Sequence, residues 1–83
     1  MEVYKKVIKK YGTVNQRRIA QEELAELIQA ISKDLRGLRN NVEEEIADVE
    51  IVLDQLKMIY SSSIIDAWKG YKLKRLERLI EEE

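Results

Sequence analysis

Apolar residues recur along most of this chain at intervals of three and four positions, which is the repeat of an α-helix with one buried side. Residues 2–11 form the first such segment, and Gly12 follows them. Glycine commonly ends a helix because it enters the left-handed backbone region without a steric penalty. The pattern therefore predicts a first helix from about Glu2 to Tyr11. Its apolar side consists of Val3, Tyr4, Val7, Ile8 and Tyr11.

The same repeat predicts a second and a third helix. The second is expected over residues 15–35, ending before Gly37. The third is expected to begin at Asn40 or Asn41, because asparagine side chains cap the first turn of a helix well, and to continue to Tyr60.

A fourth helix is expected after three consecutive serines. Ser63 with Asp66 three residues later resembles a capping box, so we expect this helix to run from there to about Ile80. Gly70 costs about 1 kcal/mol relative to alanine within a helix and allows a bend, and residues 81–83 are expected to fray. Together the segments predict an all-α, four-helix bundle-like fold, with one domain over residues 1–83.

The length and composition limit what can stabilise this fold. A domain of 83 residues buries only about 60–65% of its unfolded surface. The chain has no cysteine and no histidine, which excludes disulfides and ligation of zinc or haem iron by those residues. Stability must therefore come from helix packing, a bound metal or association with further copies, and we expect self-association.

The charge balance disfavours two classes of partner. Fifteen basic and sixteen acidic residues give a net charge of −1, whereas a nucleic-acid-binding domain normally has a clear basic excess. No apolar run approaches the roughly 18 residues of a transmembrane helix, and the start of the chain lacks the apolar segment of a signal peptide. We therefore expect a cytoplasmic protein with neither a nucleic-acid nor a membrane partner.

Two acidic residues are expected to lie within apolar helix faces. At about 100° per residue, Glu45 falls between Val52 and Leu56 on the third helix, and Asp48 lies about 60° to one side. On the second helix, Leu27 and Ala30 lie within about 40° of Glu23, and Glu26 lies about 60° to one side. Each helix therefore carries one carboxylate at the edge of the core and another on the flank, one turn later.

Ordinary solvated charges explain this arrangement poorly. Burying an ionised carboxylate without a partner costs several kcal/mol, so lysine, arginine or a metal must neutralise the group. Magnesium, with manganese as the alternative, suits carboxylate ligands. A di-iron bundle is excluded because it needs Glu-x-x-His pairs.

The fourth helix carries complementary charge. Lys72 lies within its apolar face, and Arg75 lies one turn later on the flank. Either Lys72 extends along the core edge or pairs with the acidic cluster, or it binds phosphate. The apolar residues within about 40° of Lys72 are Ile65, Trp68, Leu76 and Leu79.

Residues 22–27 read E-E-L-A-E-L, and residues 44–49 read E-E-I-A-D-V. Two such acidic pairs on adjacent helices, with Ala47 before Asp48, closely resemble the MazG-like all-α nucleoside triphosphate pyrophosphohydrolases, above all their short, single-domain, phage-type members. This family would hydrolyse a nucleoside triphosphate, often a deoxy or non-standard one, to the monophosphate and pyrophosphate with magnesium. It also implies a homodimer or a homotetramer (a dimer of dimers), with helices from two chains building each site.

The resemblance implies roles for individual residues. Glu23, Glu26, Glu45 and Asp48 correspond to the metal ligands, and Glu23 or Glu26 would also orient or deprotonate the attacking water. Lys72 and Arg75 match the basic positions that would bind phosphate. Asn41 and Gln16 project to the same side as the acidic pairs and are candidate contacts for the sugar or base.

A second hypothesis is a non-catalytic helical module that associates with itself and keeps the acidic residues as a salt-bridged core or a nucleotide-sensing site. A second apolar strip on the third helix supports association under both hypotheses. This strip consists of Ala47, Ile51 and Met58.

Overall fold

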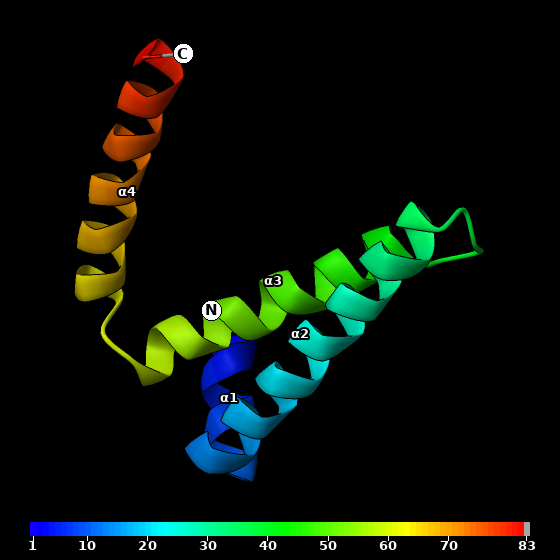
Figure 1. Cartoon of the computed structure of the whole chain (residues 1–83). Coiled ribbons are helices and arrows are strands. Elements are labelled where there is room, and N and C mark those ends of the chain that lie inside the picture. Colours follow the sequence, from blue (N-terminus) through cyan, green and yellow to red (C-terminus); the bar gives the residue numbers. More distant parts are fainter. Residues whose placement is uncertain (83) are drawn as a thin grey trace.

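A computed structural model describes residues 1–82, which form four α-helices and no strand (Figure 1). This confirms the predicted all-α fold of four helices. Among the described residues, no helix combines the length and the apolar character needed to cross a membrane. The helices are α1 (Glu2–Tyr11), α2 (Thr13–Leu35), α3 (Val42–Ile59) and α4 (Ser62–Glu82).

Most helix ends lie within two residues of their predicted positions. α2 begins at Thr13 rather than Asn15, because Gly12 has φ = 86° and ψ = 159° and this turn lets α2 follow α1 directly. Glu82 is still helical, although fraying was expected from residue 81 onward. Glu83 lies outside the described residues.

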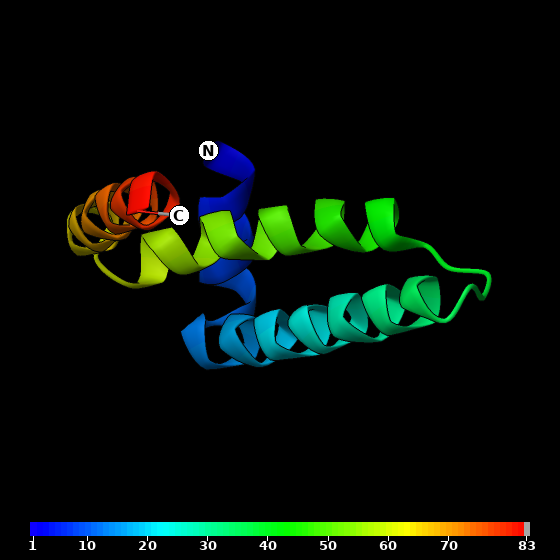
Figure 2. The same ribbon diagram turned by 45° about the horizontal axis from the view of Figure 1, so that its top comes forward.

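The connection between α2 and α3 begins at the predicted glycine. Gly37 has φ = 72°, and its N–H donates to the carbonyl oxygen of Asp34 at 3.0 Å. The amide of Asn40 then donates to the Asp34 carboxylate at 3.0 Å, and its oxygen accepts from the N–H of Val42 at 3.3 Å. These contacts reverse the chain, so that α3 runs antiparallel beside α2 (Figure 2).

The α2–α3 hairpin holds the buried core. Its buried apolar side chains are Ala20 and Ala30 on α2 and Val49 and Val52 on α3. Such small residues allow two helix backbones to approach closely, but they bury little apolar area. α1 crosses the hairpin and contacts both of its helices (Figure 2).

A polar pair interrupts this core. Gln16 of α2 donates from Nε2 to Oε1 of Gln55 of α3 at 2.9 Å, and both side chains are buried. The seven-residue spacing places Gln16 on the side of α2 that carries Glu23, and Gln55 on the side of α3 that carries Asp48. Sliding of one helix past the other would separate two buried amides, so the pair favours a single register of the hairpin.

α4 is the loosely packed part of the predicted bundle. It contacts only α3 among the described helices, none of its residues is buried, and it extends away from the hairpin (Figure 1). The Cα radius of gyration is accordingly 15.9 Å, whereas a compact chain of this length has about 12 Å.

Two local expectations for α4 are corrected. The N–H of Ile64 donates to Oγ of Ser61 at 3.3 Å, so Ser61 caps the helix in place of Ser63, which lies inside the first turn. The helix also continues through Gly70 without interruption.

Two glycine substitutions are expected to change stability in opposite directions. Gly12→Ala should lower the free energy of unfolding by about 1–3 kcal/mol, because its backbone conformation is almost exclusive to glycine. Gly70→Ala should raise it by about 0.5–1 kcal/mol, because this residue is helical and an added Cβ meets no atom within 4 Å. Urea denaturation measures both, and a loss of stability in Gly70→Ala would contradict the continuous α4.

Candidate metal centre

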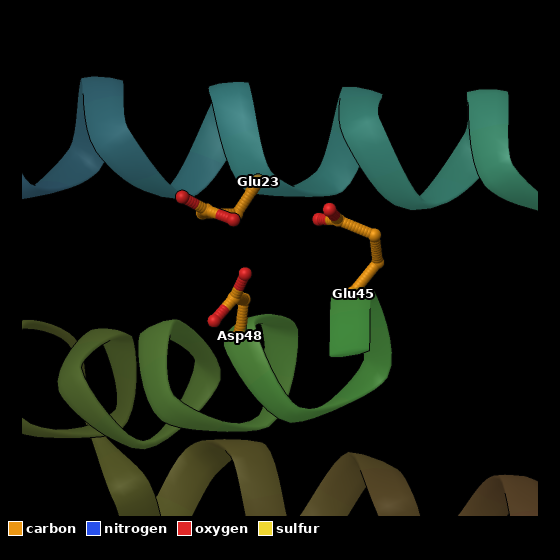
Figure 3. A group of neighbouring side chains, drawn as sticks. All are labelled: Glu23, Glu45 and Asp48. Atoms are coloured by element: carbon orange, nitrogen blue, oxygen red, sulfur yellow. The ribbon is translucent and has the colours of Figure 1, made fainter. Parts of the chain in front are cut away.

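Three carboxylates converge between α2 and α3. Glu23 lies on α2, and Glu45 and Asp48 lie one turn apart on α3. Each offers one oxygen, and these oxygens all lie within 4.8 Å of one another. Figure 3 shows the three side chains pointing into the space between the two helices.

Burial leaves two oxygens of this cluster without a hydrogen-bond partner. Only 7% of Glu45 is exposed, and Glu23 and Asp48 are half-buried. Oε2 of Glu23 and Oε2 of Glu45 are both buried and accept no hydrogen bond. An ionised carboxylate oxygen in this state lacks the compensation that buried charges normally have, so the cluster is suited to a cation.

The remaining oxygen of Glu45 is held by a neighbour. Asn41, at the N-terminal end of α3, donates from Nδ2 to Oε1 of Glu45 at 2.8 Å. The asparagine predicted as a sugar or base contact therefore orients a carboxylate of the cluster.

Burial and like charge both act on the protonation of the cluster. Burial is the main factor that raises the pKa of Glu45, followed by the negative charge of Glu26, whereas the hydrogen bond from Asn41 lowers it. Burial likewise raises the pKa of Glu23, followed by the charges of Glu26, Asp48 and Glu45. The charged groups that shift the two pKa values are all acidic.

The distances suit a small divalent cation. Magnesium bonds to oxygen at about 2.0–2.1 Å, so oxygens on opposite sides of the ion lie about 4.2 Å apart. Oxygens within 4.8 Å of one another reach this separation by small side-chain rotations. The oxygen-only donor set also matches the preference of hard cations.

The fourth predicted ligand, Glu26, lies outside this group of three. It is exposed on α2, one turn after Glu23. Its charge nevertheless raises the pKa of both Glu23 and Glu45, which places it at the edge of the cluster.

The two predicted cations are not brought to the cluster within one chain. Lys72 and Arg75 are exposed on α4, which does not contact α2. Neither contributes to the pKa shifts of Glu23 or Glu45. Lys72 lines a cavity between α3 and α4, so its predicted position on the apolar side of its helix is correct, but its pairing with the acidic cluster is not formed.

No protein-family model, no curated protein and no solved structure matches the chain.

The raised pKa of Glu45 predicts how metal-free stability depends on pH. The folded state keeps a proton at pH values where the unfolded carboxyl, with its ordinary pKa of 4.5, has lost it. The free energy of unfolding should therefore fall as the pH rises from about 4.5 through the folded-state pKa. Glu45→Gln should weaken this pH dependence and raise the melting temperature in EDTA at pH 7.

Magnesium should reverse the order of the melting temperatures of the wild type and Glu45→Gln. At a concentration 100 times the dissociation constant, a bound ion adds about 2.7 kcal/mol to the wild type and nothing to Glu45→Gln. Glu43→Gln is the matched control, because Glu43 is exposed on the same helix. A lower melting temperature for Glu45→Gln than for the wild type in EDTA, with Glu43→Gln unchanged, would contradict the prediction. It would show that the Glu45 carboxylate does not destabilise the metal-free protein.

Proposed function

We propose that the protein is a magnesium-dependent nucleoside triphosphate pyrophosphohydrolase, which releases the monophosphate and pyrophosphate. The observation that carries this proposal is the convergence of Glu23, Glu45 and Asp48, with two buried carboxylate oxygens that accept no hydrogen bond. These residues belong to the segments 22–27 and 44–49, which resemble the acidic motif of MazG-like enzymes.

The donor set favours magnesium bound together with phosphate. Magnesium gives up its bound water reluctantly and usually combines a few carboxylate ligands with water and substrate phosphates. Bound there, the ion would offset the negative charge of the triphosphate. Glu23, Glu45 and Asp48 would hold it, with Asn41 fixing the orientation of Glu45.

Glu26 is the better candidate for activating the attacking water. It is exposed and lies outside the three convergent oxygens, yet it is close enough to influence the pKa of Glu23 and Glu45. A carboxylate in this position can accept a proton from water beside the metal-bound phosphates. Glu23, which the sequence left as an alternative base, is assigned to the metal.

The phosphate-binding cations require a second chain under this proposal. Because Lys72 and Arg75 do not reach the cluster in a single chain, α4 of another copy in a homodimer or a dimer of dimers would supply them. Arginine forms two parallel hydrogen bonds with phosphate, and lysine adds a point charge.

The structure gives less support to one form of the non-catalytic alternative, the salt-bridged acidic core. A salt-bridged acidic core would give the carboxylates of Glu23 and Glu45 basic partners, but an oxygen of each accepts no hydrogen bond. A nucleotide sensor would bind a triphosphate with magnesium and leave it intact, and the assay below separates these outcomes.

Pyrophosphate release from ribo- and deoxynucleoside triphosphates, measured with and without magnesium, tests the proposal. The wild type should release pyrophosphate only with the metal. Glu45→Gln and Asp48→Asn should abolish release while keeping the helical circular dichroism signal. Glu43→Gln and Glu50→Gln, which change exposed carboxylates of the same helix, should retain activity. Nucleotide binding without release would favour the sensor, and activity in both cluster variants would refute the metal assignment.

Glu26→Gln separates water activation from metal binding. Loss of a general base lowers kcat by about 10²–10⁴-fold, and we expect this loss with unchanged magnesium affinity. Calorimetric titration of magnesium alongside the kinetic assay measures both quantities. A parallel loss of magnesium affinity would make Glu26 a fourth ligand instead.

A further inference from the structure

The single chain exposes more surface than a folded protein of its mass. Its accessible surface is 6912 Å², whereas a folded monomer of 9.8 kDa exposes about 5,200 Å². The excess of about 1,700 Å² falls within the roughly 1,000–2,500 Å² that each subunit buries in an obligate homodimer. The surplus area is therefore of the size that one further copy would cover.

α4 is the helix that the rest of the chain covers least. It has 21 residues, none of them buried, and it contacts only α3 among the described helices. In proteins, most of the stability of a helix comes from tertiary packing of its apolar face. The single chain therefore gives α4 little of the packing that normally stabilises a helix.

Two open apolar seams have matching helical spacing. On α4, Leu73, Leu76 and Ile80 are spaced by three and four residues, and each is at least half exposed. α2 has a corresponding seam with spacings of four, three and four, and its members are also exposed. Alternating steps of three and four are typical of helices that pack along each other. The α2 seam consists of Leu24, Ile28, Ile31 and Leu35.

The α4 seam borders a groove. Leu73 and Leu76 line a cavity of about 620 Å³ between α3 and α4. The opposite wall, from the end of α3, is apolar as well, and Lys57, Lys69 and Lys72 also line the cavity. α2 and α4 of one chain do not contact each other, so the α2 seam of the same chain does not fill this groove. The apolar residues of the opposite wall include Leu53, Leu56 and Tyr60.

The charges of the chain are complementary between two copies. α3 carries six acidic residues and a single basic one, and the segment 69–78 of α4 carries five basic residues and a single acidic one. Within one chain α4 meets only the end of α3, where both carry lysines. An α4 helix laid along the hairpin of a second copy would bring unlike charges together.

We propose that the groove between α3 and α4 receives the α2 seam of a second copy, in a reciprocal interface in which α4 of each chain lies along the α2–α3 hairpin of the other. The matching seams, the excess surface and the opposite charges of α3 and α4 argue for this occupant. The interface stands whether or not the protein hydrolyses nucleotides, and its test uses no activity.

Disulfide trapping tests the interface directly, because the chain has no cysteine of its own. Purified Ile28→Cys and Leu76→Cys proteins, mixed and oxidised under native conditions, should form a disulfide-linked heterodimer. A disulfide requires Cα atoms about 4.4–6.8 Å apart, so this product reports that α2 of one chain meets α4 of the other. Val3→Cys mixed with Leu76→Cys is the matched control, since Val3 is also at least half exposed but lies on α1 and belongs to neither seam.

Light scattering of the unmodified chain supplies the second measurement. An even multiple of 9.8 kDa is expected, and Ile28→Glu and Leu76→Glu should each shift the protein to the monomer while Val3→Glu does not. A wild-type mass of 9.8 kDa at 100 μM protein would overturn the proposal. An oligomer without the disulfide between positions 28 and 76, or one that crosslinks equally well through position 3, would overturn the assigned surface.

Discussion

Three carboxylates are held between α2 and α3, where burial and like charge oppose their ionisation. Glu45 is almost fully buried, Glu23 and Asp48 lie within reach of it, and the charges acting on the buried groups are negative. The core beside them contains two alanines and two valines as its only buried apolar side chains in residues 1–82, so little apolar burial offsets this repulsion. A cation between the helices would relieve the repulsion and join them at the same point.

The same shortage of buried apolar area links the acidic site to assembly. A hairpin with small core residues and a helix without buried residues bury little apolar area in one chain, so we expect the single chain to have low stability. A metal at the hairpin and a second copy along α4 would each supply stability where the chain lacks it. Association would also bring basic residues of α4 toward a helix that is strongly acidic, so that binding of an anionic substrate and assembly would depend on the same element.

Helical periodicity predicted those features that are decided within a single helix. The burial of Glu45, the direction of Asp48 and the position of Lys72 on the apolar side of α4 follow from 100° per residue and agree with the structure. Periodicity predicts which side of a helix a residue occupies but not where the helix lies in the fold, so it could not show that Lys72 lies away from the acidic cluster of its own chain. It also placed Gln16 beside the acidic pairs, but the bond between Gln16 and Gln55 depends on the register of two helices, which no single-helix pattern contains.

The claim that Glu23, Glu45 and Asp48 form a metal centre is tested most directly by calorimetric titration of Mn²⁺ and Mg²⁺ into the metal-free protein. Saturable binding is predicted, lost in Asp48→Asn and retained in Glu50→Gln. Because burial and like charge raise the pKa values of Glu23 and Glu45, binding should release protons, and its affinity should increase with pH. Absence of saturable binding, or binding that Asp48→Asn leaves unchanged, would contradict the assignment.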